Sequence, residues 1–163
     1  MASTYTPLAS TTLGSAAASY TFSSISGSYT DLRLVITGTS SGAYADVDLR
    51  FNGDTASNYS WTVLAGNGSS ATSYRASSQT ATRTTNQGYM TSSRTVITSD
   101  IMNYSNATTY KTVLSRANNA ATGTDAAVGL WRSTSAITSV EVRAVGSNFA
   151  TGSTFTLYGI QAA

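Results

Sequence analysis

The chain has 163 residues, of which 40% are hydrophobic and only 10% are charged, and its formal net charge at pH 7 is +2. It contains neither cysteine nor histidine, which excludes disulfides, the usual zinc ligand sets, cysteine nucleophiles and Ser-His-Asp triads. The length suits a single domain with a real core, and no apolar run approaches the roughly 18 residues of a membrane-spanning helix.

The sequence predicts that residues 1–11 form an N-terminal arm and that 12–163 form a single domain. The segment is uncharged, mildly apolar and stiffened by Pro7, the only proline. It lacks the charged and apolar regions of a secretion signal, so we expect a protein that is made in the cytoplasm and stays there or leaves the cell by lysis. We expect Tyr5, Pro7 and Leu8 to lie along a neighbouring subunit or another surface, and removal of 1–8 to abolish docking without unfolding the domain.

Short strands follow in the first half of the domain. Tyr20 and Phe22 share one face of a short strand, and a second strand covers 31–39. The clearest pattern lies at 44–51, where three apolar residues alternate with three charged ones: Val47, Leu49 and Phe51 against Asp46, Asp48 and Arg50. This alternation predicts one buried face and one wet face. The sequence Asn52-Gly53 then predicts a turn before a further strand from Tyr59.

Residues 68–94 form a polar excursion, rich in serine, threonine, alanine and glutamine. Two weak strands or one long loop fit this stretch, and long loops in compact domains are often functional. Arg75, Arg83 and Arg94 would offer forked donors to acidic or carbonyl groups of a partner. We therefore expect the excursion and the N-terminal arm to carry most of the docking contacts.

The β pattern returns after residue 94 and continues to the end of the chain. The last stretch, 137–160, predicts two neighbouring antiparallel strands whose linker lies between Gly146 and Gly152. We expect the final strand to close the fold from the middle of a sheet. No stripe of 3.6-residue period is present, and about eight to ten strands are expected in all. The sequence thus predicts an all-β, antiparallel, jelly-roll-like β-sandwich.

Four stretches carry a resemblance to known proteins: TLGSAAASYTF (12–22), LRFNGDTASNYSW (49–61), GLWRST (129–134) and GSTFTLYGI (152–160). They resemble small virion structural proteins of tailed bacteriophages, including cyanophages. The resemblance covers most of the chain and rests on structural motifs. It implies synthesis in the host bacterial cytoplasm, a location in the virion and a role as a capsid decoration (cement) protein, a head fibre or a tail-appendage module.

The acidic residues give little support for a metal or a catalytic site. Asp46, Asp48 and Asp54 are close in sequence, but they lack the glycine and glutamate spacing of a calcium loop. Three further acids lie in or beside strands: Asp31, Asp100 and Glu141. No two of the acids stand out as a glycosidase pair. We therefore expect no metal, no cofactor and no catalytic residues.

Aromatic and basic residues leave a binding role open. Trp61, Trp131, Tyr59 and Tyr158 would suit a sugar-binding surface, although both tryptophans lie in apolar β runs and are predicted to belong to the core. The eight arginines are scattered singly, whereas nucleic-acid-binding proteins gather basic residues into a stripe. We therefore expect no nucleic acid and no membrane among the partners.

Low charge and a high content of serine and threonine suit a β-protein that packs among copies of itself. We expect a non-enzymatic decoration or cement protein that stabilises a phage head, as a homo-oligomer, with a trimer as the expected state. Its partners would be copies of itself and the major capsid protein or other virion proteins. The alternative is a head- or tail-fibre module that recognises a host glycan. A glycan-degrading enzyme is the third alternative.

Overall fold

The computed structural model describes residues 4–161 and consists of twelve antiparallel strands. They are β1 (Tyr5–Thr12), β2 (Ser19–Phe22), β3 (Asp31–Gly38), β4 (Ala45–Phe51), β5 (Tyr59–Gly66), β6 (Ala71–Gln79), β7 (Thr82–Arg83), β8 (Thr95–Met102), β9 (Lys111–Asn119), β10 (Gly123–Trp131), β11 (Val140–Gly146) and β12 (Thr154–Ile160). None of residues 4–161 lies in an α-helix, so this part of the chain contains no helix that could cross a membrane.

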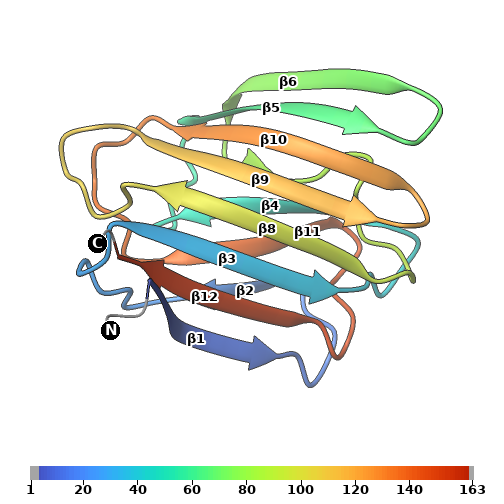
Figure 1. The fold of residues 1–163 in the computed structure, drawn as a ribbon, viewed down its shortest axis with the longest axis horizontal. Coiled ribbons are helices and arrows are strands. Elements are labelled where there is room, and N and C mark those ends of the chain that lie inside the picture. The colour runs from blue at the N-terminus through green and yellow to red at the C-terminus, as the bar shows by residue number, and fades with distance from the viewer. Residues whose placement is uncertain (1–3, 162–163) are drawn as a thin grey trace.

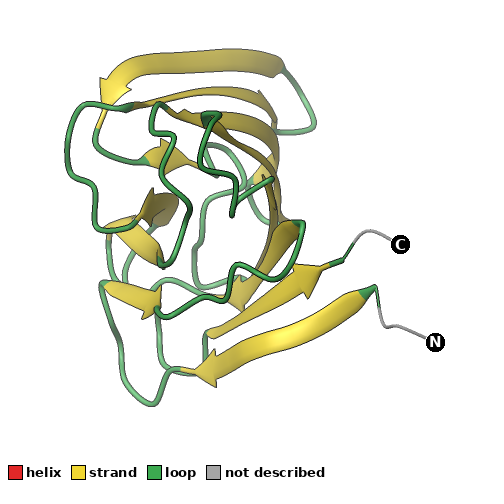
Figure 2. Cartoon of the chain, turned by 90° about the vertical axis from the view of Figure 1, so that its left-hand side faces the viewer, coloured by secondary structure: helices red, strands yellow, loops and turns green. Residues whose placement is uncertain are grey.

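The strands form two sheets that pack face to face (Figures 1 and 2). The large sheet has eight strands in the order β1-β12-β3-β8-β9-β10-β5-β6, and the small sheet has the order β2-β11-β4-β7. The chain is an all-β, jelly-roll-like sandwich, and the predicted fold class is confirmed. The twelve strands exceed the expected eight to ten because β1, β6 and β7 lie where the sequence shows no clear apolar alternation.

The core lies between the two sheets. Strand β3 alternates strictly between half-buried and buried residues, and β4 does the same. Val47, Leu49 and Phe51 are fully buried, while Asp48 and Arg50 are half-buried on the opposite face, so the predicted faces of β4 are confirmed. The predicted turn at Asn52-Gly53 is also present, with positive φ at both residues. It leads the chain from β4 in the small sheet to β5 in the large one.

The N-terminal segment differs from the expected arm. From Tyr5 onward it is β1, which pairs with β12 along one edge of the large sheet. Leu8 is half-buried and packs against the core. Pro7 is tolerated because it lies in an edge strand, where one side of the backbone has no strand neighbour. Residues 1–3 lie outside the described part of the chain.

The predicted pairing of the last two strands is wrong. β11 lies in the small sheet between β2 and β4, and β12 lies in the large sheet between β1 and β3. The linker between them therefore crosses from one sheet to the other. Phe149, in the middle of this linker, is fully buried and packs edge-on against Phe155. The burial of this ring explains why the linker crosses the sandwich instead of forming a hairpin turn.

The polar excursion contains two strands, which was one of the two arrangements that the sequence allowed. β6 is the other edge of the large sheet, and the two-residue β7 pairs with β4 at the edge of the small sheet. The following turn is attached to β10 by Asp125. The Asp125 carboxylate accepts hydrogen bonds from the backbone N–H groups of Asn86, Gln87 and Gly88, at 2.5, 3.0 and 2.7 Å.

Candidate functional site

The outer face of the large sheet, which points away from the small sheet, carries the three most exposed of the large hydrophobic side chains on strands. Leu64 is 61% exposed, Val128 54% and Leu114 45%. Ala126, also exposed, lies opposite Leu64, and Val128 lies opposite Leu114. These four residues, here called the outer patch, therefore form one contiguous group across β5, β10 and β9. Contiguous apolar surface of this kind marks interaction sites more often than isolated exposed residues do.

The outer patch follows from strand geometry. Successive side chains of a strand point to opposite faces, so one residue of each adjacent apolar pair has to face outward. Val63 and Leu64 form such a pair in β5, and Val113 and Leu114 form another in β9. In both pairs the valine is buried in the sandwich and the leucine is exposed. The apolar runs of these strands thus supply both the core and the outer patch.

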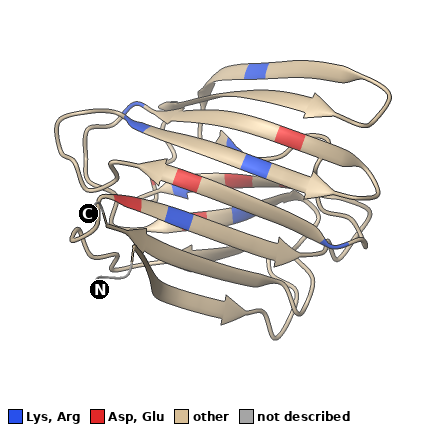
Figure 3. Cartoon of the chain, in the orientation of Figure 1, with Lys and Arg blue, Asp and Glu red and all other residues tan. Residues whose placement is uncertain are grey.

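Two arginines border the outer patch and have no ion-pair partner within residues 4–161. Arg116 on β9 lies opposite Ala126, and Arg75 on β6 lies opposite Thr62 of β5. Both are exposed. Figure 3 shows basic positions on both β6 and β9, the strands that lie on either side of β5 and β10. The outer patch is therefore an apolar surface flanked by two free positive charges.

Two open grooves run along this face. The larger has a volume of about 1000 Å³ and is lined by residues that include Leu64, Ala126 and Arg116. The second has a volume of about 620 Å³ and is lined by Val128, Arg75 and other residues. The first groove is lined by 64–66 of β5 and 124–126 of β10, and the second by 60–62 and 128–130 of the same strands, so the two grooves lie end to end along β5 and β10. Arg132, at the far end of the second groove, donates a hydrogen bond to Ser60 Oγ at 3.0 Å.

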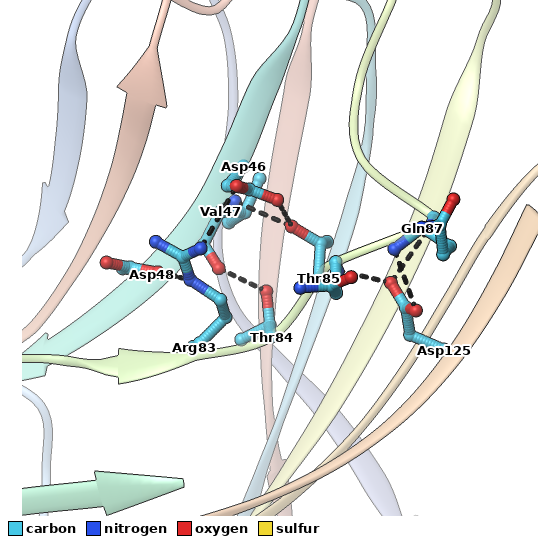
Figure 4. A network of polar contacts seen from close by, with 10 residues as sticks. Asp46, Val47, Asp48, Arg83, Thr84, Thr85, Gln87 and Asp125 are labelled. Carbon is cyan, nitrogen blue, oxygen red and sulfur yellow. Dashed lines mark hydrogen bonds and ion pairs between the residues drawn. The ribbon is translucent and has the colours of Figure 1, made fainter. Parts of the chain in front are cut away.

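The small sheet presents a contrasting surface, in which opposite charges neutralise each other. Arg83 Nη1 lies 3.1 Å from Asp46 Oδ2, and its Nε lies 3.1 Å from Asp48 Oδ1 (Figure 4). Arg50 pairs with Glu141 at 3.1 Å. Burial raises the pKa of both the Asp46 and the Asp48 carboxyl groups, and the nearby Arg83 guanidinium opposes this effect without cancelling it. These acids serve structural ion pairs.

The other candidate acids are also engaged in the fold. The Asp54 carboxylate accepts hydrogen bonds from Trp131 Nε1 at 2.7 Å, from Asn58 Nδ2 at 3.0 Å and from the Ala56 N–H at 2.9 Å. Burial acts to raise the pKa of Asp54, but these hydrogen bonds outweigh it and lower the pKa. Asp54 thus serves a different structural cluster from Asp46 and Asp48. In the described chain, no three His, Cys, Asp or Glu residues form a group that could hold a metal ion.

The two remaining acids that were weighed as glycosidase candidates occupy structural contacts as well. Asp100 forms a two-pronged ion pair with Arg33, whose Nε and Nη2 lie 2.5 and 2.9 Å from the carboxylate oxygens. Asp31 accepts a hydrogen bond from the Asn103 N–H at 2.6 Å. Lys111 is fully buried, and its ammonium donates to the carbonyl oxygens of Thr109 and Thr134. Asp31, Asp100 and Lys111 all have partners within the fold, and none of them lines either outer groove.

The residues predicted to dock are spread over different parts of the molecule. Arg75 is the one that borders the outer patch. Arg83 is held by its ion pairs and lies over the Trp61 ring, with its guanidinium carbon 5.5 Å from the ring centre. Arg94 is exposed just before β8, away from the lining of both outer grooves. Tyr5 accepts a hydrogen bond from Arg33 at 2.8 Å on the β1 edge.

The aromatic residues considered for sugar binding lie mostly inside the sandwich. Tyr59 and Trp131 are buried and stack with a 6.1 Å spacing between their ring centres, which confirms that Trp131 belongs to the core. Trp61 is half-buried and packs beside a small second cluster around Val63. Tyr158 is half-buried and packs edge-on against Tyr5. The sequence reasoning missed the outer patch and Arg116, although the adjacent apolar pairs could have revealed the patch.

No protein-family model and no curated protein matches the sequence. Solved structures with a similar fold include an exo-inulinase from Aspergillus awamori (11% identity, TM-score 0.45) and galectin LEC-6 from Caenorhabditis elegans (13%, 0.37). A third is the alginate lyase Aly36B (8%, 0.37). They cover 93–96% of this chain, which corresponds to 29% of the inulinase, 96% of the galectin and 77% of the lyase.

Proposed function

We propose that this chain is a non-enzymatic structural protein of a tailed-phage virion that decorates the head and docks on the coat through the outer face of its large sheet. The proposed docking surface rests on one observation, the outer patch with Arg75 and Arg116 at its borders. The resemblance of four stretches to phage virion proteins and the low content of charged residues support the location.

The acidic residues support a non-enzymatic role. Asp46, Asp48, Asp100 and Glu141 are held in ion pairs, and Asp54 accepts three hydrogen bonds within its own cluster. A glycosidase needs two carboxyl groups on either side of the bond that it cleaves. A protein that acts by docking needs no such pair of carboxyl groups. Its acidic residues are then available for ion pairs between strands of the same sheet.

Docking through the outer patch combines two physical effects. Burial of Leu64, Leu114 and Val128 removes apolar surface from water, at about 25 cal/mol for each Å². Arg75 and Arg116 can then donate forked hydrogen bonds to carboxylate or carbonyl groups at the rim of the contact.

The outer grooves favour glycan recognition as a second candidate function. The two grooves lie end to end, are lined in part by serine and threonine, and include Arg116, Arg75 and Arg132. An extended anionic polysaccharide would find hydroxyl partners and positive charges along this line. The aromatic content of the grooves weighs against it, because Trp61, the aromatic residue in their lining, is half-buried under Arg83 and offers no open stacking platform.

The docking proposal is tested with a double variant, Leu114→Ser with Val128→Ser, added to virions that lack the protein. We expect its affinity for the particles to fall at least about tenfold, which corresponds to ~1.4 kcal/mol. The melting temperature should stay close to that of the unchanged protein, because both side chains are exposed. Tyr110→Ser, which removes an exposed side chain that belongs neither to the outer patch nor to the lining of the two grooves, is the matched control and should decorate normally.

Decoration by the double variant at the unchanged affinity would contradict docking through the outer patch. Arg75→Ala with Arg116→Ala separates the two candidate functions. If this variant loses retention on an anionic polysaccharide while the Leu114/Val128 variant still decorates particles, glycan recognition is the better account. If the arginine variant shows weaker particle binding that depends less on salt, docking on the virion is supported.

A further inference from the structure

The two edges of the large sheet are built differently. β1, at one edge, contains Pro7 and an irregular register between Pro7 and Ala9. β6, at the other edge, has nine residues and no proline, and it is regular from Ala71 to Ala76 against β5. Proteins usually block exposed edges with proline, bulges, charges or very short strands. β1 carries such protection, and most of β6 does not.

Most of β6 is open to solvent on both of its faces. Every residue from Ala71 to Arg75 is exposed, and within residues 4–161 β5 is the one strand that pairs with it. Its outer row of N–H and C=O groups is therefore available to another strand. The two edges of the small sheet are shorter, with four residues in β2 and two in β7. β6 is thus the edge best suited to pairing with a further chain.

We propose that β6 pairs in antiparallel fashion with β6 of a second copy, so that two large sheets join into one. Strand pairing of this kind is satisfied by backbone groups and needs no particular side-chain motif. Pairing of β6 with β1 of a second copy is disfavoured because Pro7 removes an N–H donor and the bulge interrupts the register. A contact of β6 with itself is self-complementary and closes at two copies.

The charge on β6 selects the register of this contact. Arg75 is the only charged residue of the strand. Pairing centred on Arg75 would place two guanidinium groups opposite each other, which destabilises a strand pair. Pairing centred on Tyr74 places Arg75 opposite Ser73 of the partner subunit and brings the two Tyr74 rings together. Aromatic pairs across strands are favourable, and Tyr74 is 38% exposed and available for this contact.

The joined sheet would present both outer patches on the same side, because the two-fold axis of such a contact is perpendicular to the sheet. Each dimer would then dock with two patches at once. The pairing yields a two-fold dimer, so the trimer expected from the sequence would need another contact. The contact uses an edge that the outer patch does not occupy, so it is tested independently of docking on a virion.

Single-cysteine variants test the contact, since the chain has no cysteine of its own. Directly opposed residues of two antiparallel strands have Cα atoms ~4.5–5.5 Å apart, within the range that a disulfide spans. Under mild oxidation, we expect Tyr74→Cys to form a covalent dimer in high yield. Arg75→Cys and the exposed loop variant Tyr110→Cys should remain largely uncrosslinked. Light scattering of the unchanged protein should approach twice the 16.9 kDa of one chain as its concentration rises.

Tyr74→Lys supplies a second measurement that uses no oxidation. It would place two lysines opposite each other, and the protein should become monomeric with an unchanged circular dichroism spectrum, whereas Tyr110→Lys should leave the dimer intact. A monomeric unchanged protein at all concentrations would overturn the pairing, and so would a trimer that Tyr74→Lys does not dissociate. A covalent dimer from Arg75→Cys but not from Tyr74→Cys would overturn the proposed register.

Discussion

Truncation of Phe51 to alanine should lower the free energy of unfolding by about 3–5 kcal/mol, measured by urea denaturation. Phe51 is fully buried at the end of β4, and its ring centre lies 5.6 Å from that of Trp131 and 6.3 Å from that of Tyr59. The variant loses the transfer free energy of the ring and leaves a cavity between the two sheets. The rigid neighbouring rings limit how far the site can collapse.

A hydrogen bond reinforces the packing around Phe51. The Phe51 N–H donates to the Tyr59 hydroxyl at 3.0 Å, and burial raises the pKa of Tyr59 to about 12. The Tyr59 hydroxyl therefore keeps its proton at all ordinary pH values.

Tyr44→Ala, which removes a half-exposed ring, is the control and should cost far less than Phe51→Ala. A loss below about 1 kcal/mol for Phe51→Ala would contradict the assignment of the buried face of β4.

Replacement of Asp125 by alanine should cost about 2–4 kcal/mol, because three backbone donors lose a charged acceptor at once. The Asp125 side chain reaches from β10 to the turn after β7, where Gly88 is buried. Water can reach the half-buried Asn86 and Gln87 in the variant, which limits the loss. Asp125→Asn keeps one acceptor oxygen and should show an intermediate loss in the same denaturation experiment.

Hydrogen exchange provides the local measurement for Asp125. In Asp125→Ala, the amide protons of Asn86, Gln87 and Gly88 should exchange much faster than in the unchanged protein, because opening of the turn no longer breaks charged hydrogen bonds, while those of β3 should change far less. Uniformly faster exchange across both sheets, with no excess in the turn, would show that Asp125 supports the whole sandwich rather than this segment.

Local patterns were sufficient to predict the fold class and the faces of the clearest strands. In β4, each apolar residue alternates with a charged one, so the buried face could be assigned without knowledge of any neighbour. The connection between β11 and β12 could not be assigned in the same way. Glycines occur at the ends of a linker that crosses between two sheets as readily as at the ends of a hairpin turn. The two cases are distinguished here by the contact of Phe149, in the linker, with Phe155 of the large sheet.

The candidate docking surface depends on register and was only partly open to prediction. The outward direction of Leu64 and Leu114 follows from their buried neighbours Val63 and Val113. Their proximity follows only from the order β9-β10-β5, which no local pattern specifies. Arg83 illustrates the opposite case. Its sequence context suggested a free donor, but strand pairing places it beside Asp46 and Asp48.

A density map of the virion that carries this chain, at a resolution that traces its strands, tests the docking proposal most directly. We expect many copies on the head, each with Leu64, Leu114 and Val128 buried against the coat and with Arg75 and Arg116 close to acidic or carbonyl groups. The ion-paired face of the small sheet should point toward solvent. Copies that contact the particle through the small sheet, with the outer patch exposed, would contradict the proposal.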